Sequence, residues 1–333
     1  MPRRPVRVLL AAVLALAAVL AAACSGGGGA APEGPTRVVE TDLGPVTVPV
    51  SPQRVVATGY AVPALIEAGV PLVGISTWTR GTALMSADER ATYDRVEKVG
   101  ADQAAETDYE KVAATDPDLI VIGVPRPVLA DVDVARLQSI APVVAIGPNT
   151  PSDWRELTRR QADAAGRLAA FDDARTRYEQ KAAALRAKYA PVLAGRTFGH
   201  VGGYGRVAAG TFHREYAGSW GTNIAGDVGV TYVGEPTVKG GGSKDSSEYP
   251  ALEELPAKLG SVDSITYSVR ADGTPSDAVR AVLENPLWQT LPAVQAGRVY
   301  PLARTEAATY ETANRTLDSV DQALAPLLAS PTS

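Results

Sequence analysis

The sequence predicts an α/β protein in which two series of strands and helices lie on either side of one long helical region. Two observations predict this fold. Short apolar runs alternate with helical segments in residues 36–152 and again in residues 192–333, and a polar, helix-forming stretch separates them at residues 153–191. Strands that are apolar along their whole length are typical of parallel sheets covered by helices on both faces.

The composition excludes several classes of protein. With 333 residues, of which 45% are hydrophobic and 21% charged, the chain is long enough for two lobes with buried cores and is not disordered. Its 32 Lys and Arg against 37 Asp and Glu give a net charge of −5, whereas nucleic-acid binders usually present a basic face. One cysteine excludes an internal disulfide, and two histidines argue against a histidine-rich metal site.

The first 23 residues predict a signal peptide. Three arginines precede residue 8, and residues 8–23 are 16 apolar residues without a charge. A membrane-spanning helix needs about 20 such residues, whereas this shorter length suits the apolar region of a signal peptide. We therefore expect residues 1–23 to be removed and the mature chain to be exported.

Cys24 follows directly and is the only cysteine in the sequence. The junction resembles a bacterial lipobox, although Ala21 stands where that pattern usually has leucine. We expect Cys24 to be lipidated and the glycine-rich residues 24–35 to form a flexible tether, which would anchor the protein on the outer face of the cell membrane. The alternative is an ordinary cleaved signal peptide followed by an incidental cysteine.

The N-terminal lobe is predicted to comprise residues 36–152. β-Branched residues surround a Leu-Gly-Pro turn in residues 36–50, a pattern typical of a hairpin. Helical segments at residues 62–68 and 109–114 lie between the apolar runs that follow. We expect parallel strands at residues 55–57, 72–75, 119–122 and 143–146.

The helical region, residues 153–191, has a clear start signal. Thr150, Pro151 and Asp153 match the N-cap, the first-turn proline and the acidic third position of a helix. Strong helix formers fill residues 173–189, which predicts a second and longer helix. We expect that helix to stop at Pro191, because proline cannot donate the next helical hydrogen bond.

The C-terminal lobe, residues 192–333, repeats the alternation of strands and helices. A final helix is predicted at residues 311–328, where leucine and valine side chains form one apolar stripe. We expect strands at residues 197–201, 228–233, 264–269 and 299–301.

Five segments of the chain together resemble a known family, the ABC-transporter solute-binding proteins that carry ferric siderophores, cobalamin or haem. The resemblance lies in the order and spacing of the segments and covers residues 36 to about 328. It implies two α/β lobes joined by one long helix, with a ligand between the lobes and little movement on closure. The segments are residues 52–56, residues 67–75, residues 109–121, residues 140–143 and residues 288–300.

Polar and aromatic residues that follow the predicted strands are the candidate ligand contacts. Ligands of open α/β sheets bind at the carboxyl ends of the strands, and a cleft between two lobes is the default pocket. In a ferric siderophore the iron is already fully coordinated, so the protein needs arginine for the chelating oxygens and aromatic rings for the apolar parts. The candidates are Tyr60, Trp78, Arg80, Arg126, Tyr204, Arg206, Trp220, Tyr267, Arg304 and Tyr310.

We expect no catalytic residue, no metal ligand and no resident cofactor; the expected ligand is an Fe(III)–siderophore complex. The resemblance also implies an acidic residue on each lobe that pairs with arginines of the membrane permease, here Glu110 and Glu253, with Glu254 as the near alternative to Glu253. The expected partners are therefore an ABC permease, its ATPase through the permease, and the membrane through the lipid anchor. The protein is expected to be a monomer.

Two alternatives stay open. The same fold could bind cobalamin or haem, and His213 with Tyr216 could ligate haem iron, whereas His200 lies inside a predicted strand and is expected to be a buried structural residue. A secreted enzyme is the alternative from a different class. The chain has no GxSxG, HExxH or CxxC motif, and the GxGxxA of residues 203–208 is followed by glycines where a nucleotide-binding helix should run.

Overall fold

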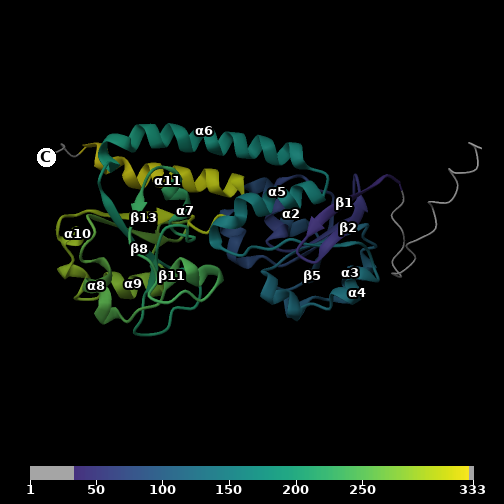
Figure 1. Cartoon of the computed structure of the whole chain (residues 1–333), viewed down its shortest axis with the longest axis horizontal. Coiled ribbons are helices and arrows are strands. Elements are labelled where there is room, and N and C mark those ends of the chain that lie inside the picture. The colour runs from purple at the N-terminus through teal and green to yellow at the C-terminus, as the bar shows by residue number, and fades with distance from the viewer. Residues whose placement is uncertain (1–33, 330–333) are drawn as a thin grey trace, which may run out of the picture.

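The structure, a computed structural model, describes residues 34–329 and has two α/β lobes side by side, covered along one edge by long helices (Figure 1). The family-like fold expected from the sequence is confirmed. No helix between residues 34 and 329 combines the length and the apolar character that crossing a bilayer requires.

The N-terminal lobe is built on a five-stranded sheet in which all neighbouring strands are parallel, in the order β5-β4-β3-β6-β7. The predicted hairpin forms a separate pair, β1 (Thr36–Thr41) and β2 (Gly44–Pro49). The sheet strands are β3 (Val55–Gly59), β4 (Leu72–Ser76), β5 (Lys98–Gly100), β6 (Leu119–Gly123) and β7 (Val143–Ala145). The helices of this lobe are α1 (Ala61–Glu67), α2 (Ala87–Arg95), α3 (Tyr109–Ala114) and α4 (Val134–Gln138), with the 3-10 helices η1 (Thr79–Leu84) and η3 (Arg126–Asp131).

The C-terminal lobe has a mixed sheet in the order β11-β9-β8-β12-β13, with β10 paired to β8. Strands β8, β12 and β13 are parallel, and β9 runs antiparallel to β8. The strands are β8 (Thr197–Gly202), β9 (His213–Glu215), β10 (Thr231–Tyr232), β11 (Ser247–Glu248), β12 (Ser264–Val269) and β13 (Val299–Ala303). The helices are α7 (Asn223–Asp227), α8 (Leu255–Leu259), α9 (Asp277–Leu283) and α10 (Pro292–Gln295).

Three helices connect the lobes: α5 (Trp154–Ala164), α6 (Leu168–Leu193) and α11 (Tyr310–Ala329). Helix α6 runs along the top of both lobes in Figure 1, with α11 beneath it. Its 26 residues correspond to about 39 Å. The predicted cap at Thr150 is confirmed, since the Asp153 carboxylate accepts the Thr150 backbone N–H at 2.8 Å just before α5.

The predicted ends of the long helix were wrong at both termini. Helix α6 begins at Leu168, five residues before the predicted start, because Gly166, with φ of 68°, makes the turn after α5. It also continues through Pro191 to Leu193. Pro191 lies in the last turn, where a proline removes a single hydrogen bond and the neighbouring residues keep theirs.

Beneath α6, an aromatic cluster lies where the helices of the two lobes meet. The ring of Tyr310 is 4.9 Å from that of Trp154, 5.3 Å from Phe171 and 5.4 Å from Tyr178 between centroids. The Tyr310 side chain is 5% exposed. The structure therefore places this predicted ligand contact in the core at the start of α11, where edge-to-face packing of the rings adds to burial.

The start of α11 is held against the N-terminal lobe by polar contacts. Arg315 pairs with Glu89 of α2 at 2.8 Å and donates to the Leu84 carbonyl at 2.9 Å. The carboxylate of Glu67, at the end of α1, accepts the Glu311 backbone N–H at 3.2 Å. These contacts fasten the C-terminal helix to the opposite lobe on the side away from the cleft mouth.

The Glu67 contact predicts a pH dependence of stability. Burial, with smaller contributions from the carboxylates of Glu311 and Glu89, raises the pKa of Glu67 to about 8, while hydrogen bonds oppose the change. Protonated Glu67 therefore contributes to the free energy of unfolding. This contribution is fully present below about pH 4.5 and is lost as the pH rises through about 8. In thermal denaturation, Glu67→Gln should therefore raise the Tm relative to wild type at about pH 9 and much less at about pH 5. An equal difference in Tm between Glu67→Gln and wild type at both pH values would contradict this assignment.

Candidate ligand-binding cleft

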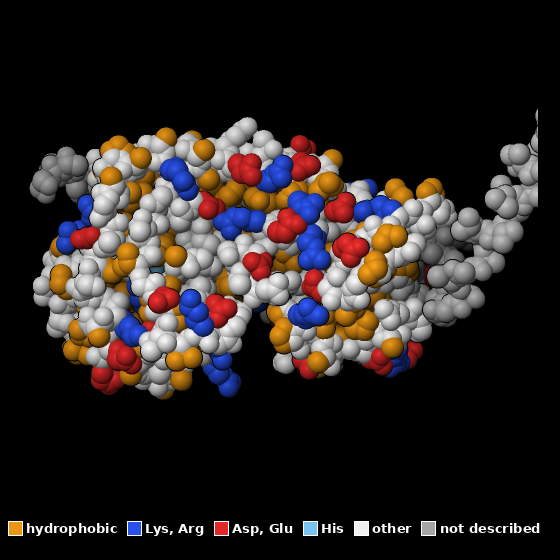
Figure 2. Space-filling model, viewed as in Figure 1, with side chains coloured by type: hydrophobic (Ala, Val, Ile, Leu, Met, Phe, Trp, Pro, Cys, Tyr) orange, Lys and Arg blue, Asp and Glu red, His pale blue; other side chains and the backbone are white. Residues whose placement is uncertain are grey.

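The two lobes are separated by a notch on the side opposite α6 (Figure 2). At its base lies a cavity of about 260 Å³, lined by residues of both lobes. The N-terminal lobe contributes Tyr60, which follows β3, together with Pro125 and residues 148–151. The C-terminal lobe contributes Tyr204, Trp220 and the loop of residues 240–244. The cleft is thus at the carboxyl ends of parallel strands, as the sequence predicted.

Arg80 lies beside this cavity and contacts Tyr60 and Tyr204, which line it. The residue is in η1, directly after β4, and its guanidinium group crosses the boundary between the lobes. Nη2 donates to the Tyr60 hydroxyl at 2.7 Å, and Nη1 donates to the Tyr204 hydroxyl at 3.1 Å. One guanidinium therefore joins a tyrosine of each lobe.

Four aromatic rings surround this guanidinium. We refer to Arg80 and these four residues, Tyr60, Trp78, Tyr204 and Trp220, as the aromatic box. The Arg80 Cζ atom is 4.7 Å from the ring centroids of Tyr60 and Trp78, 5.2 Å from Tyr204 and 5.5 Å from Trp220. Such distances allow cation–π attraction to each ring. The arrangement offers a planar donor group between apolar surfaces.

The rings of the aromatic box also contact one another across the cleft. Tyr60 and Trp220 are stacked, with centroids 5.9 Å apart and planes 7° apart, and Tyr60 meets Trp78 edge-on at 4.8 Å. Burial raises the pKa of Tyr60, so that its hydroxyl is neutral and can accept from Arg80. Trp220 and Trp78 are 4% and 6% exposed.

Five of the ten predicted contacts thus come together in the aromatic box: Tyr60, Trp78, Arg80, Tyr204 and Trp220. Arg304 lies at its edge: with φ of 60°, the residue donates from Nη1 to the Ala83 carbonyl of the opposite lobe at 3.4 Å. The remaining four predicted contacts are not part of the aromatic box, although Arg126 directly follows Pro125 of the cavity wall. Arg126 and Arg206 are exposed, Tyr267 is half-buried against the C-lobe core, and Tyr310 lies in the aromatic cluster beneath α6.

Sequence reasoning missed two features of the cleft. Glu306, in the segment after β13, is a half-buried acid whose pKa is raised by burial and lowered by Arg80, so it is the acidic neighbour of the aromatic box. The loop of residues 240–244 forms part of the C-lobe wall. Its sequence is Gly-Gly-Gly-Ser-Lys, and three glycines suit a loop that passes close to another chain segment.

The histidines do not face the cleft. His200 is fully buried in β8, as predicted. His213, the possible haem ligand, is 2% exposed and its ring is stacked on Tyr249 at 4.6 Å. The haem-ligating role suggested for His213 is therefore wrong: strand β9 directs this side chain into the lobe. Within residues 34–329, no group of three or more His, Cys, Asp or Glu is arranged to hold a metal ion.

The two predicted permease contacts are exposed, one on each lobe. Glu110, in the first turn of α3, pairs with Arg136 of α4, and Glu253 lies in the short 3-10 turn before α8. Helices α3 and α8 both lie in the half of the molecule away from α6 in Figure 1. Glu254 caps its own helix by accepting the Ala251 N–H at 3.1 Å, so Glu253 is the freer of the two neighbours.

Comparison with known proteins agrees with this architecture. The chain is 25% identical to the putative ABC transporter substrate-binding lipoprotein YhfQ of Bacillus subtilis, over 80% of each sequence. It is 26% identical to the iron(3+)-hydroxamate-binding protein YxeB of the same organism, over 79% of this chain and 77% of the relative.

Among solved structures, the siderophore periplasmic binding protein from the fuscachelin gene cluster of Thermobifida fusca matches with a TM-score of 0.68 and 29% identity, over 84% of this chain and 98% of that one. The family model for periplasmic binding proteins matches residues 55–305, which include both lobes and every member of the aromatic box. The chain belongs to the periplasmic binding protein family.

Proposed function

We propose that this protein captures a ferric siderophore between its lobes and delivers it to an ABC permease. The aromatic box carries the proposal, since it places one arginine and four rings from both lobes around one point of the cleft. The oxygens of an iron chelate accept hydrogen bonds from a guanidinium, and the rings cover the apolar linkers. The iron belongs to the ligand, so the protein supplies no metal ligand.

Binding, with no bond-making step, is the chemistry that these residues support. A hydrolase or transferase would need a nucleophile or a base aimed into the cleft. The cleft instead presents tyrosine hydroxyls, an arginine and the acid Glu306. The named relatives are likewise binding proteins, for iron(3+)-hydroxamate in one case and for a siderophore in another.

Titration of tryptophan fluorescence tests the ligand class. Trp78 and Trp220 lie in the aromatic box, so a ferric chelate that enters the cleft should quench their emission. Ferrioxamine, ferric enterobactin, haem and cobalamin are the probes, and at least one ferric siderophore should saturate the signal at submicromolar concentration. Quenching by haem or cobalamin alone would overturn the siderophore proposal in favour of the alternative ligand of the same fold.

Delivery requires a docking surface, and Glu110 and Glu253 suit one. They are exposed acids on separate lobes, Glu110 in α3 and Glu253 directly before α8, and both helices lie away from α6 in Figure 1. Contact with arginines of a permease would fix the orientation of the complex and increase the association rate. In this proposal a monomer docks with one acid on each half of the permease, whose ATPase drives release of the ligand.

Anchoring by Cys24 is the last part of the proposal, and Cys24 lies outside the residues that the structure describes. The lone cysteine at the end of a signal-like segment supports lipidation. Cys24→Ala should release the protein from cells into the medium, as measured by fractionation and immunoblotting. Retention of this variant on the membrane in the same amount as wild type would contradict a lipid anchor.

A further inference from the structure

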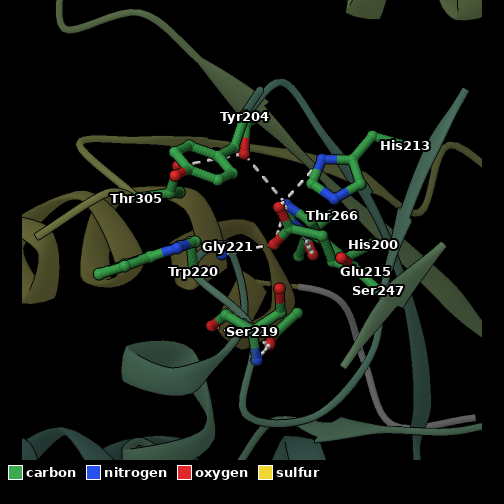
Figure 3. A network of polar contacts seen from close by, with 12 residues as sticks. His200, Tyr204, His213, Glu215, Ser219, Trp220, Gly221, Ser247, Thr266 and Thr305 are labelled. Carbon is green, nitrogen blue, oxygen red and sulfur yellow. Dashed lines mark hydrogen bonds and ion pairs between the residues drawn. The ribbon is translucent and has the colours of Figure 1, made fainter. Parts of the chain in front are cut away.

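Behind the cleft, the C-terminal lobe holds a buried acid–imidazole pair that ligand contact does not explain (Figure 3). Glu215 and His213 are on the same face of β9 and are 1% and 2% exposed. His213 Nδ1 lies 3.3 Å from Glu215 Oε1. Among residues 34–329, neither ring nitrogen of His213 has a well-aligned hydrogen bond to any other group. The Glu215 carboxyl thus lies within ion-pair distance of a buried imidazole that has no hydrogen-bond partner within residues 34–329.

The second oxygen of the carboxyl holds the loop that carries Trp220. Glu215 Oε2 accepts the backbone N–H of Gly221 at 2.5 Å. There is no room for a side chain at this glycine, because a Cβ atom would lie 2.4 Å from Oε2 and 2.2 Å from His200 Nε2. Trp220 directly precedes Gly221, and its ring is stacked on Tyr60 of the opposite lobe. The carboxyl thus fixes the backbone next to one ring of the aromatic box.

The imidazole supports the second C-lobe ring of the aromatic box. The His213 ring is parallel to that of Tyr249 within 8°, at 4.6 Å. Tyr249 in turn donates from its hydroxyl to the Tyr204 carbonyl at 3.4 Å. A Cβ atom at Gly202 would lie within 2.6 Å of both members of the pair, so the strand beside them is closely packed as well. Contacts from the pair therefore lead to both Trp220 and Tyr204.

Within the described part of the chain, no lysine or arginine lies within ion-pair distance of the Glu215 carboxyl, whose close partners are the two histidines. The Arg214 guanidinium donates to three backbone carbonyls instead. His200 lies 3.9 Å from Glu215 Oε2 with both ring nitrogens bonded to Thr266 and Ser268. Three other ionisable groups interact electrostatically with Glu215. Glu306 raises the pKa of Glu215, and Glu215 in turn raises the pKa values of Tyr232 and Tyr249.

These surroundings favour one shared proton. Burial, with a smaller contribution from Glu306, raises the pKa of Glu215 to about 7, although the Gly221 N–H, the Ser219 side chain and the Arg214 guanidinium oppose the change. Burial also lowers the pKa of His213 to about 4. Near neutral pH and below it, the pair therefore holds a protonated carboxyl beside a neutral imidazole, so that the O–H can donate to Nδ1. The two groups titrate as a unit, and the proton belongs to the pair.

We propose that Glu215 and His213 form a proton-sharing pair that positions Trp220 and Tyr204, so that ligand affinity depends on one proton buried behind the cleft. This inference rests on the proposed ligand site. Loss of the proton places a negative charge in a buried site, where Glu306 acts against it, and removes the hydrogen bond to His213 Nδ1 that supports the stack on Tyr249, while the Gly221 N–H stays bound to Oε2. Affinity should therefore be constant at mildly acidic pH and fall as the pH rises past neutrality, by about tenfold by pH 8.5.

The pair can first be tested without a ligand. The chain has two histidines, so ring-labelled histidine gives two sets of NMR signals. In wild type, one set should shift with a midpoint near pH 7 as Glu215 loses its proton. In Glu215→Gln the shift should vanish, because the amide accepts from Gly221 and donates to Nδ1 without titrating. Failure of the wild-type signals to shift would overturn the shared proton.

The positioning role is tested by affinity for the ferric siderophore that the fluorescence titration identifies, from about pH 6 to 9. Glu215→Gln should bind with the acidic wild-type affinity at every pH, whereas Glu215→Leu should bind about tenfold more weakly throughout. Glu284→Gln, an exposed acid of the same lobe, is the matched control and should keep the wild-type profile. A variant Glu215→Gln that retains the wild-type pH dependence would overturn the role.

The outcomes separate this inference from the proposed function. If none of the four probes binds, the proposed function fails, and positioning is then judged from acrylamide quenching of the free protein. Glu215→Leu should expose the Trp220 emission, identified by difference from Trp220→Phe, and Glu215→Gln should not. Binding of a siderophore with an affinity that does not vary between about pH 6 and 9 leaves the proposed function intact and overturns this inference alone.

Discussion

Replacing Arg80 with alanine should weaken binding of a ferric siderophore by about 100-fold, the largest effect expected from one side chain in the cleft. The guanidinium is the cation inside the aromatic box, and its two bonds to Tyr60 and Tyr204 join the lobes. A chelate in the cleft would take over these charge-assisted donors, each worth about 1.5–3 kcal/mol, and 100-fold corresponds to about 2.7 kcal/mol. Fluorescence or calorimetric titration with the chelate that binds wild type gives the measurement.

Arg80→Lys separates charge from shape. Lysine keeps the positive charge but cannot present a planar fork between four rings, so an intermediate loss of about tenfold is expected. Arg95→Ala, an exposed arginine of α2, is the control for a general loss of charge and should bind as wild type does. An Arg80→Ala variant with unchanged affinity and unchanged Tm would show that the aromatic box is not the ligand site.

Much of the fold could be predicted because the central strands carry their own signal. Strands β3 and β6 are buried at every position, and each appears in the sequence as an apolar run that ends in glycine. Strand β9, in contrast, consists of His, Arg and Glu, which no apolar pattern reveals. Its burial depends on partners distant in sequence, such as the carbonyls that accept from Arg214. Local pattern cannot show such compensation.

The candidate site could be predicted only as far as the ends of the strands determine where the residues that follow them lie. A residue that follows a parallel strand must lie near the cleft, and this located Tyr60 and Arg80. The rule gives the position of the backbone and not the direction of the side chain, so it did not distinguish Arg80, which joins the aromatic box, from Arg126 and Arg206, which do not. Glu306 escaped notice because its importance comes from burial beside Arg80, a tertiary property.

Gly123→Ala should both unfold the protein at lower temperature and weaken ligand binding. Gly123 ends β6, and its carbonyl accepts the Tyr60 backbone N–H at 2.8 Å. A Cβ atom there would lie 2.2 Å from the Ala61 nitrogen and 2.9 Å from that of Tyr60. These are backbone atoms at the start of α1, so relief requires moving the helix and Tyr60 together. We expect a loss of about 2–4 kcal/mol and a Tm lower by about 10 °C in calorimetry.

Gly226→Ala provides the matched control for this change. Gly226 lies in α7, and a Cβ atom there would meet no other atom within 4 Å, so stability should stay within about 1 kcal/mol of wild type. Equal Tm values for Gly123→Ala and wild type would contradict the close approach of β6 to Tyr60. A lower Tm with unchanged affinity would mean that the neighbouring rings hold Tyr60 in place. We expect Gly123→Ala to lower both the Tm and the ligand affinity, because the backbone contact at Gly123 joins the central strand β6 directly to Tyr60 of the aromatic box.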